Sequence, residues 1–142
     1  LAAGLEIPEN GVILTTVADK DKEEALPVIK GFSQLGFRLC ATGGTAAFLR
    51  SHGLDVEKVS KLREGRPNIV DLIREGKIHF VFNTFTKGRQ LESDGFAIRR
   101  AAVEHGIPCL TSLDTFGALL RVMKGRSLGK GSGVMAIQDY VS

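Results

Sequence analysis

Short apolar runs alternate with helix-forming segments along almost the whole of this chain. Each run is rich in Val, Ile, Leu, Phe or Cys, and the segments between the runs repeat their apolar residues with helical spacing. Strands that alternate with helices in this way are joined by right-handed crossovers into a parallel sheet covered by helices. We therefore predict an α/β fold in three layers with a central, mostly parallel sheet of five strands. The predicted strands are Val12–Val17, Arg38–Ala41, Asp55–Val59, Ile78–Phe82 and Cys109–Thr111.

Capping residues and glycines set the expected helix boundaries. Asp21 and the charged residues after it fit a capping arrangement, and Pro27 lies about one turn into that helix, where we expect a bend or a frayed first turn. Asn68 is placed to cap a helix that continues through Glu75 and stops at Gly76. The other predicted segments are helices Lys22–Leu35, Ala46–Ser51, Asp94–His105 and Leu113–Met123, polar loops Ser60–Pro67 and Asn83–Ser93, and an edge strand or docked tail at Val134–Val141.

Length and charge narrow the class of protein. A chain of 142 residues is expected to form one domain, and its net charge of +3 is too mild to favour nucleic acid. One Tyr, no Trp and scattered Phe give no stacking platform for single strands. No apolar run reaches the ~18 residues of a membrane span, and the first residues lack the basic start of a signal peptide. We therefore expect neither a nucleic-acid nor a membrane partner, whereas a pocket for a small anion fits the charge.

The cysteines and histidines indicate no metal site. Cys40 and Cys109 each lie in an apolar strand pattern, which is typical of buried reduced thiols in a reducing compartment rather than of a disulfide. His52, His79 and His105 are scattered and have no ligand spacing among them.

The segment Thr42-Gly43-Gly44-Thr45 is the strongest candidate for a binding site. It joins an apolar strand to a helix, so its unpaired N–H groups, its two hydroxyls and the positive helix end meet at one point. The two glycines would let the backbone approach an anion closely. These features indicate a phosphate site. The alternative interpretation is an ordinary strand-to-helix turn with Thr45 near the N-cap.

Polar residues follow four of the predicted strands. A lone lysine is typical of a solvated surface charge, but the carboxyl ends of parallel strands meet at one edge, where ligands bind. We therefore expect one anion pocket there. The residues concerned are Asp19, Lys20, Asp21 and Lys22 after the first strand, Thr42–Thr45 after the second, Ser60 and Lys61 after the third, and Asn83 and Thr84 after the fourth.

These segments together resemble the methylglyoxal-synthase-like (MGS-like) domain, specifically the C-terminal allosteric domain of the large subunit of glutamine-dependent carbamoyl phosphate synthetase. The resemblance implies a Rossmann-like fold for residues 11–142, preceded by a linker from a synthetase core at residues 1–10. The segments that carry it are Thr16–Lys22, Ala41–Ala46, Val59–Pro67, Val81–Thr84 and Ile98–Ala102.

The resemblance also implies roles for individual residues. Around the phosphate of the effector it places Thr16, Lys22, Thr42, Gly43, Gly44, Thr45 and Lys61. Around the ribose and base it places Ile69, Asn83, Thr84, Arg89, Asp94 and Ile98, and it places Thr111 against the synthetase core. The segment Thr84–Glu92 is one residue longer here than in the family.

The function that the resemblance implies is regulatory. In that family the domain binds nucleoside monophosphates such as UMP and IMP and modulates carbamoyl phosphate synthesis for pyrimidine and arginine biosynthesis. This implies no catalytic residue, cofactor or metal in the domain itself, whereas the full cytoplasmic ligase is expected to use ATP and Mg. The implied partners are the nucleotide, the synthetase core of the same chain and, through it, the glutaminase small chain.

Two enzyme interpretations remain as alternatives. A methylglyoxal synthase needs a carboxylate base on the loop after the third strand. That loop lacks the Gly-Gly-Asp of the synthases here, although Glu64 is nearby, and Asn83-Thr84 stands where they have Asp-Pro. The inosine-monophosphate cyclohydrolase domain has similar opening segments, but the similarity fades after Lys61.

Overall fold

The centre of the molecule is a sheet of five parallel strands, which are β2 (Val12–Thr16), β3 (Arg38–Thr42), β4 (Val56–Val59), β5 (Phe80–Asn83) and β6 (Cys109–Leu110). The computed structural model describes residues 6–8, 11–60, 68–84, 89–128 and 134–136. The strand order is β4-β3-β2-β5-β6, and each neighbouring pair is parallel. The predicted Rossmann-like α/β architecture is therefore confirmed.

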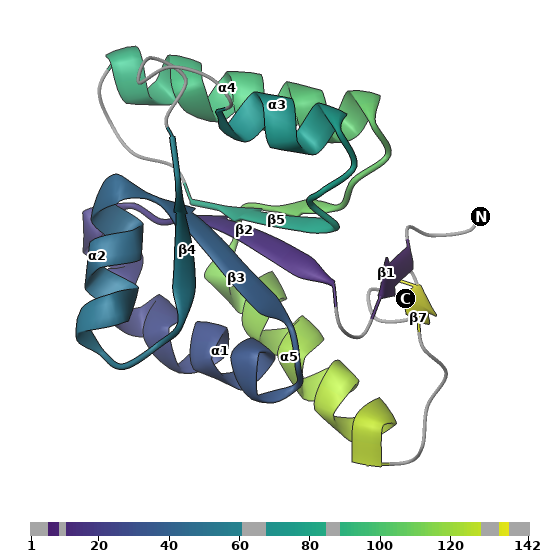
Figure 1. Ribbon diagram of the computed structural model, residues 1–142. Coiled ribbons are helices and arrows are strands. Elements are labelled where there is room, and N and C mark those ends of the chain that lie inside the picture. Colours follow the sequence, from purple (N-terminus) through teal and green to yellow (C-terminus); the bar gives the residue numbers. More distant parts are fainter. Residues whose placement is uncertain (1–5, 9–10, 61–67, 85–88, 129–133, 137–142) are drawn as a thin grey trace.

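Helices cover both faces of the sheet (Figure 1). On one face lie α1 (Lys22–Gln34), α2 (Gly43–Ser51) and α5 (Leu113–Leu128), and on the other lie α3 (Ile69–Arg74) and α4 (Arg89–Glu104). Between β2 and α1 runs the short 3-10 helix η1 (Asp19–Asp21). The three layers enclose two hydrophobic cores, one on each side of the sheet.

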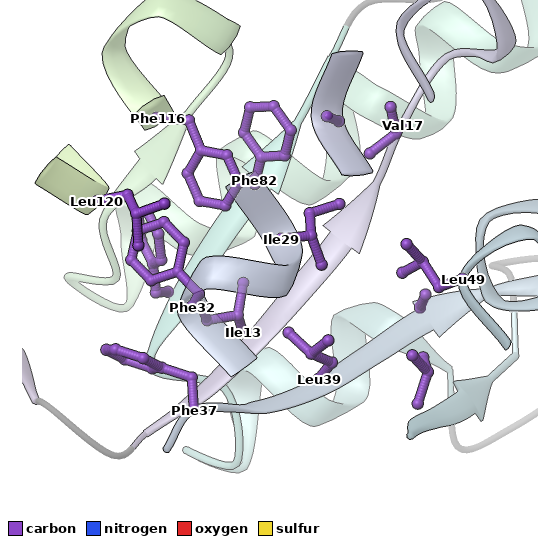
Figure 2. Close-up of a cluster of buried hydrophobic side chains, with 14 of the residues drawn as sticks. Ile13, Val17, Ile29, Phe32, Phe37, Leu39, Leu49, Phe82, Phe116 and Leu120 are labelled. Atoms are coloured by element: carbon purple, nitrogen blue, oxygen red, sulfur yellow. The ribbon is translucent and has the colours of Figure 1, made fainter. Parts of the chain in front are cut away.

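Stacked phenylalanines form the centre of the hydrophobic core between the sheet and helices α1, α2 and α5 (Figure 2). The ring of Phe116 on α5 stacks on Phe82 of β5 and Phe32 of α1, with ring centroids 3.9 Å and 4.7 Å away. All three side chains are fully buried. Because each ring comes from a different element, this stack joins the sheet to both helices.

Two helix starts illustrate the capping predictions. Asn68 caps α3 as predicted: its Oδ1 accepts from the N–H groups of Val70 and Asp71, and the Asp71 carboxylate accepts from the N–H of Asn68. At α1 the prediction is wrong, because the side chain of Asp21 makes no capping hydrogen bond and lies 3.9 Å from the ammonium of Lys20 instead. The expected frayed first turn is also wrong, since α1 is helical from Lys22 and contains Pro27 within it.

Three predicted helix boundaries differ from the structure. Helix α2 begins at Gly43 rather than at Ala46, so both glycines lie in its first turn. Helix α4 begins at Arg89, inside the segment predicted as a polar loop, and α5 continues past Met123 to Leu128. At α2 the added residues include poor helix formers, because Gly43 and Gly44 have low helix propensity.

A separate two-stranded sheet pairs the beginning of the chain with its end. Strand β1 (Glu6–Pro8) runs antiparallel to β7 (Val134–Ala136). The prediction of an edge strand at Val134–Val141 is therefore corrected, because the strand covers three residues and joins β1 rather than the central sheet. The residues of that prediction beyond 136 lie outside the described part of the chain.

Candidate functional site

The register of the sheet brings the predicted strand ends together. Thr16, the last residue of β2, pairs with Asn83, the last residue of β5. On the other side of β2, Thr15 pairs with Ala41, so Thr42 at the end of β3 is next to Thr16. The carboxyl ends of three neighbouring strands thus form one continuous edge, as the sequence predicted.

Helix α2 begins directly at this edge, without a separate turn. Thr42 is its N-cap residue, and the Thr42 side chain makes no capping hydrogen bond, although it is only 7% exposed. Its hydroxyl bonds to no residue that the structure describes. Gly43 and Gly44 occupy the first helical turn, where N–H groups have no partner within the helix. The alternative that placed Thr45 near the N-cap is wrong by one helical turn.

Lys22 faces this helix start. A Cβ atom built on Gly44 would lie 3.7 Å from the Lys22 ammonium nitrogen, so this glycine leaves the space beside the ammonium open. The Lys22 side chain is only 14% exposed, and its stem lines a small pocket with apolar side chains that include Ile29 and Phe48. The ammonium group is bonded to the carboxylate of Asp19, and this bond and the positive charge lower the pKa of Asp19.

Two predicted threonines hold the segment that carries Lys22. The N–H of Val17 donates to the Thr45 hydroxyl oxygen at 3.1 Å, and the N–H of Ala18 donates to that of Thr84 at 2.7 Å. Thr45 and Thr84 are 5% and 6% exposed. Both hydroxyls are therefore bonded within the protein, and they fix the start of the β2–α1 connection from two sides.

Asn83 belongs to a polar cluster at the end of β5. Its side-chain nitrogen donates to the hydroxyl of Thr16, and its side-chain oxygen accepts from Arg99 at 2.9 Å. Arg99 lies on α4, one turn after Gly95, and a Cβ on Gly95 would lie 2.9 Å from its Nη1 atom. The two hydrogen bonds set the direction of the Asn83 amide.

Sequence analysis missed Arg99. It lies in the segment Ile98–Ala102 that carried the family resemblance, but nothing there separates it from Arg100. The available signal was Gly95, four residues earlier on the same helix face, because a residue without a side chain leaves room for a long one.

The remaining predicted site residues are distributed as follows. Ile69 and Ile98 are 2% and 3% exposed and belong to the core under α3 and α4. Thr111 is half-buried and follows the edge strand β6. Lys61 lies outside the described residues, and Arg89 and Asp94 lie in α4, where the structure describes their backbone but not their side chains.

Neither cysteine takes part in the polar edge. Cys40 and Cys109 are free thiols, as predicted, with Cys40 buried and Cys109 partly so. Burial raises the pKa of Cys40 to about 12, with a smaller effect from the charge of Glu57, and burial raises that of Cys109 to about 11. Both thiols therefore stay protonated and weakly nucleophilic at neutral pH.

The described part of the chain has neither a metal-ligand group nor a helix that could span a membrane. Among these residues no three His, Cys, Asp or Glu side chains are grouped so that they could hold a metal ion. Within the same residues no helix is long and apolar enough to cross a membrane.

The family of the chain follows from its sequence profile. The profile of the MGS-like domain matches residues 24–111, which include β3, β4, β5 and the start of α2. This chain belongs to the MGS-like domain family. The matched range covers more than half of the chain and contains Thr42, Asn83 and Arg99 of the site edge.

Solved structures of other proteins have the same fold as this MGS-like domain. Methylglyoxal synthase from Elizabethkingia anophelis is 20% identical and has a TM-score of 0.65, with 81% of this chain and 80% of that chain covered. The protein ForH is 21% identical with a TM-score of 0.60, and the match covers 87% of this chain and 82% of ForH. At these identities the likeness establishes the fold.

Proposed function

We propose that this MGS-like domain is a regulatory domain that binds the phosphate of a nucleoside monophosphate at the start of α2. The observation that carries the proposal is the juxtaposition of the Lys22 ammonium with the first turn of α2, beside the unbonded Thr42 hydroxyl. A cation and a helix N-terminus then lie next to each other, and the helix begins at Thr42.

The chemistry of these groups suits a phosphate monoester. Its charge approaches −2 at neutral pH, and the N-terminus of a helix favours negative charge through its dipole and its unpaired N–H groups. Lys22 supplies a full positive charge that is largely shielded from water, where charge-assisted hydrogen bonds are strong. The buried Thr42 hydroxyl supplies a further donor.

The neighbouring polar cluster suits the sugar or base of the same ligand. Asn83 lies at the end of β5, beside Thr16, and two strands separate β5 from β4. Its amide keeps one N–H and one oxygen lone pair beyond its bonds to Thr16 and Arg99. We propose that Asn83, held by Arg99, contacts the nucleoside while Lys22 holds the phosphate.

The wider context follows from the family resemblance of the sequence. We propose that the domain serves the large chain of a cytoplasmic carbamoyl phosphate synthetase and responds to UMP or IMP. Its partners would be the synthetase core, which uses ATP and Mg, and through it the glutaminase small chain. The regulated product would feed pyrimidine and arginine biosynthesis.

The competing function is elimination of phosphate from dihydroxyacetone phosphate by a carboxylate base. Among the described residues, the carboxylate that contacts Lys22 beside the start of α2 is that of Asp19, and it is bound to the Lys22 ammonium group. At the end of β5 stands the amide of Asn83, which cannot act as a base at neutral pH. Glu64 lies outside the described residues. We therefore favour binding without turnover.

Calorimetric titration with UMP, IMP and dihydroxyacetone phosphate tests the proposal. We expect UMP or IMP to bind, and Lys22→Ala to weaken that binding by about 1.5–3 kcal/mol, as for hydrogen bonds to a charged group. Lys20→Ala is the matched control, because Lys20 is two residues away and 70% exposed. It should change the affinity by less than about twofold, since exposed charges are well screened.

Two results would contradict the proposal. Equal nucleotide affinity in the parent and in Lys22→Ala would mean that the phosphate does not bind at α2. Methylglyoxal formation from dihydroxyacetone phosphate that Glu64→Gln abolishes would replace regulation by catalysis.

A further inference from the structure

Lys22 and Asp19 form an ion pair whose two members differ sharply in exposure. The Lys22 side chain is 14% exposed, whereas that of Asp19 is 95% exposed. Lys22 is the first residue of α1, and Asp19 is the first residue of η1, three positions earlier. The buried partner is thus fixed by its surroundings, and the exposed partner lies on a single turn of 3-10 helix.

The burial of Lys22 makes a counter-charge necessary. A charged ammonium group taken out of water is costly unless an anion compensates it. In the described part of the chain, that anion is the Asp19 carboxylate. An exposed carboxylate contributes little to an ion pair and is released at small cost, because water solvates it well.

The position of the pair matters because the ammonium group also faces the start of α2. The Lys22 nitrogen would lie 3.7 Å from a Cβ on Gly44, so an anion bound in the first turn of α2 would meet the same ammonium group. The –NH₃⁺ group has three hydrogens, but a phosphate bound beside it would repel the negatively charged Asp19 carboxylate, so the two anions compete for the same ammonium group.

We propose that Asp19 is an internal counter-anion that the phosphate of the effector displaces, so that Asp19 sets the affinity of the site. The inference rests on the proposed function, since it assumes that the anion bound at α2 is a phosphate. In the free domain Asp19 compensates Lys22. In the bound domain the phosphate takes over, and Asp19 turns to solvent. Asp19 therefore keeps phosphate binding weaker than Lys22 and the first turn of α2 would give without it.

The neighbouring acid provides a matched control. Asp21 lies two residues from Asp19 on the same turn, but its carboxylate lies 3.9 Å from Lys20 rather than at Lys22. Asp19→Asn and Asp21→Asn change the net charge equally and at nearly the same place. A general electrostatic effect would change both variants alike, whereas displacement concerns Asp19 alone.

The experiment titrates the parent, Asp19→Asn and Asp21→Asn with inorganic phosphate and with UMP. We expect Asp19→Asn to bind both ligands about two- to five-fold more tightly than the parent, which corresponds to the loss of one exposed ion pair. Asp21→Asn should bind like the parent. Thermal unfolding of the three proteins checks that the variants are folded.

The possible outcomes distinguish a failure of the inference from a failure of the proposed function. Binding by Asp19→Asn alone, with none by the parent, also supports displacement. Equal or weaker binding by Asp19→Asn would overturn the inference and leave the phosphate site intact, since Asp19 would then hold Lys22 in place. An equal gain in both variants would also overturn it. Absence of binding in all three proteins would refute the inference and the proposed function together.

Discussion

The absence of a side chain at Gly95 leaves room for the hydrogen bond between Arg99 and Asn83. On α4, a Cβ at position 95 would lie 2.9 Å from Nη1 of Arg99 and 3.5 Å from Oδ1 of Asn83. The first distance is too short, so the guanidinium group would have to move, which a long side chain does at low cost. The hydrogen bond of 2.9 Å between Arg99 and Asn83 is the contact that such a movement would break.

Gly95→Ala is therefore expected to separate binding from stability. Alanine favours a helix over glycine by about 1 kcal/mol, so the free energy of unfolding should stay equal or rise. UMP affinity should fall by about 0.5–1.5 kcal/mol, the value of one hydrogen bond, while the affinity for inorganic phosphate stays unchanged. Calorimetry with both ligands and denaturant unfolding measure the three quantities.

A second glycine supplies the control for this prediction. A Cβ on Gly125, in α5, would meet no atom within 4 Å. Gly125→Ala should change stability alone and leave both affinities at the parent value. Unchanged UMP affinity in Gly95→Ala as well would show that Arg99 does not orient Asn83 for a ligand.

At the scale of elements, the connection between β2 and α1 positions Lys22. In this connection the N–H of Val17 donates to the Thr45 hydroxyl on α2, and the N–H of Ala18 donates to the Thr84 hydroxyl just after β5. Asp21 closes η1 with an N–H bond of 2.9 Å to the carbonyl oxygen of Ala18. The position of Lys22 thus depends on two threonines that the sequence analysis assigned to the ligand.

Thr84→Val tests this role of the connection. The change keeps the shape of the side chain but leaves the buried N–H of Ala18 without its acceptor, which costs about 1–3 kcal/mol of stability. Phosphate affinity should fall as well, because Lys22 loses its fixed position. Thr84→Ser should restore both quantities. Denaturant unfolding and calorimetric titration provide the measurements.

Thr115→Val serves as the comparison for this pair of variants. Thr115 lies on α5, and its hydroxyl makes no hydrogen bond within the described ranges, so neither stability nor affinity should change by more than about 0.5 kcal/mol. If Thr84→Ser binds phosphate as weakly as Thr84→Val, the hydroxyl of Thr84 does not position Lys22.

The elements also show which parts of the fold the sequence could predict. The strands were predictable because their apolar runs are distinct, and Asn68 was predictable as a cap because its signal is local. The starts of α2 and α4 were not, since Gly43 has a low helix propensity and the polar segment after Arg89 has few apolar residues to mark a helical period. The β1–β7 pair joins residues more than a hundred positions apart, which no local pattern encodes.

The candidate site was predictable to a similar degree. Parallel topology places the strand ends together, so Thr42 and Asn83 could be grouped from the sequence pattern, and the family resemblance added Thr16. Which hydroxyl is bonded inside the protein and which remains unbonded depends on side-chain geometry. Thr45 and Thr42 are alike in sequence, and only the structure distinguishes them.

At the scale of the whole molecule, the β1–β7 sheet and the candidate site lie toward opposite ends of β2. The β1–β7 pair is joined to β2 at its first residue, Val12, whereas the candidate site lies beyond its last residue, Thr16 (Figure 1). In the proposed regulatory arrangement, a signal from bound phosphate to the residues before β1 would thus pass along the central strands or through the aromatic core that packs on them (Figure 2).

The last prediction concerns that coupling in a carbamoyl phosphate synthetase large chain that carries this domain. An effector shifts the core only if its affinity differs between the active and inactive states of the core. Linkage then requires that a ligand of the core changes effector affinity by the same factor, typically equivalent to about 1–3 kcal/mol.

Nucleotide affinity should therefore change when ATP saturates the core, whereas the isolated domain should not respond to ATP. Titration of the large chain with UMP or IMP, with and without saturating ATP, measures this. Identical affinities would mean that the domain binds nucleotide without coupling it to ATP binding, and the regulatory proposal would lose its physical basis.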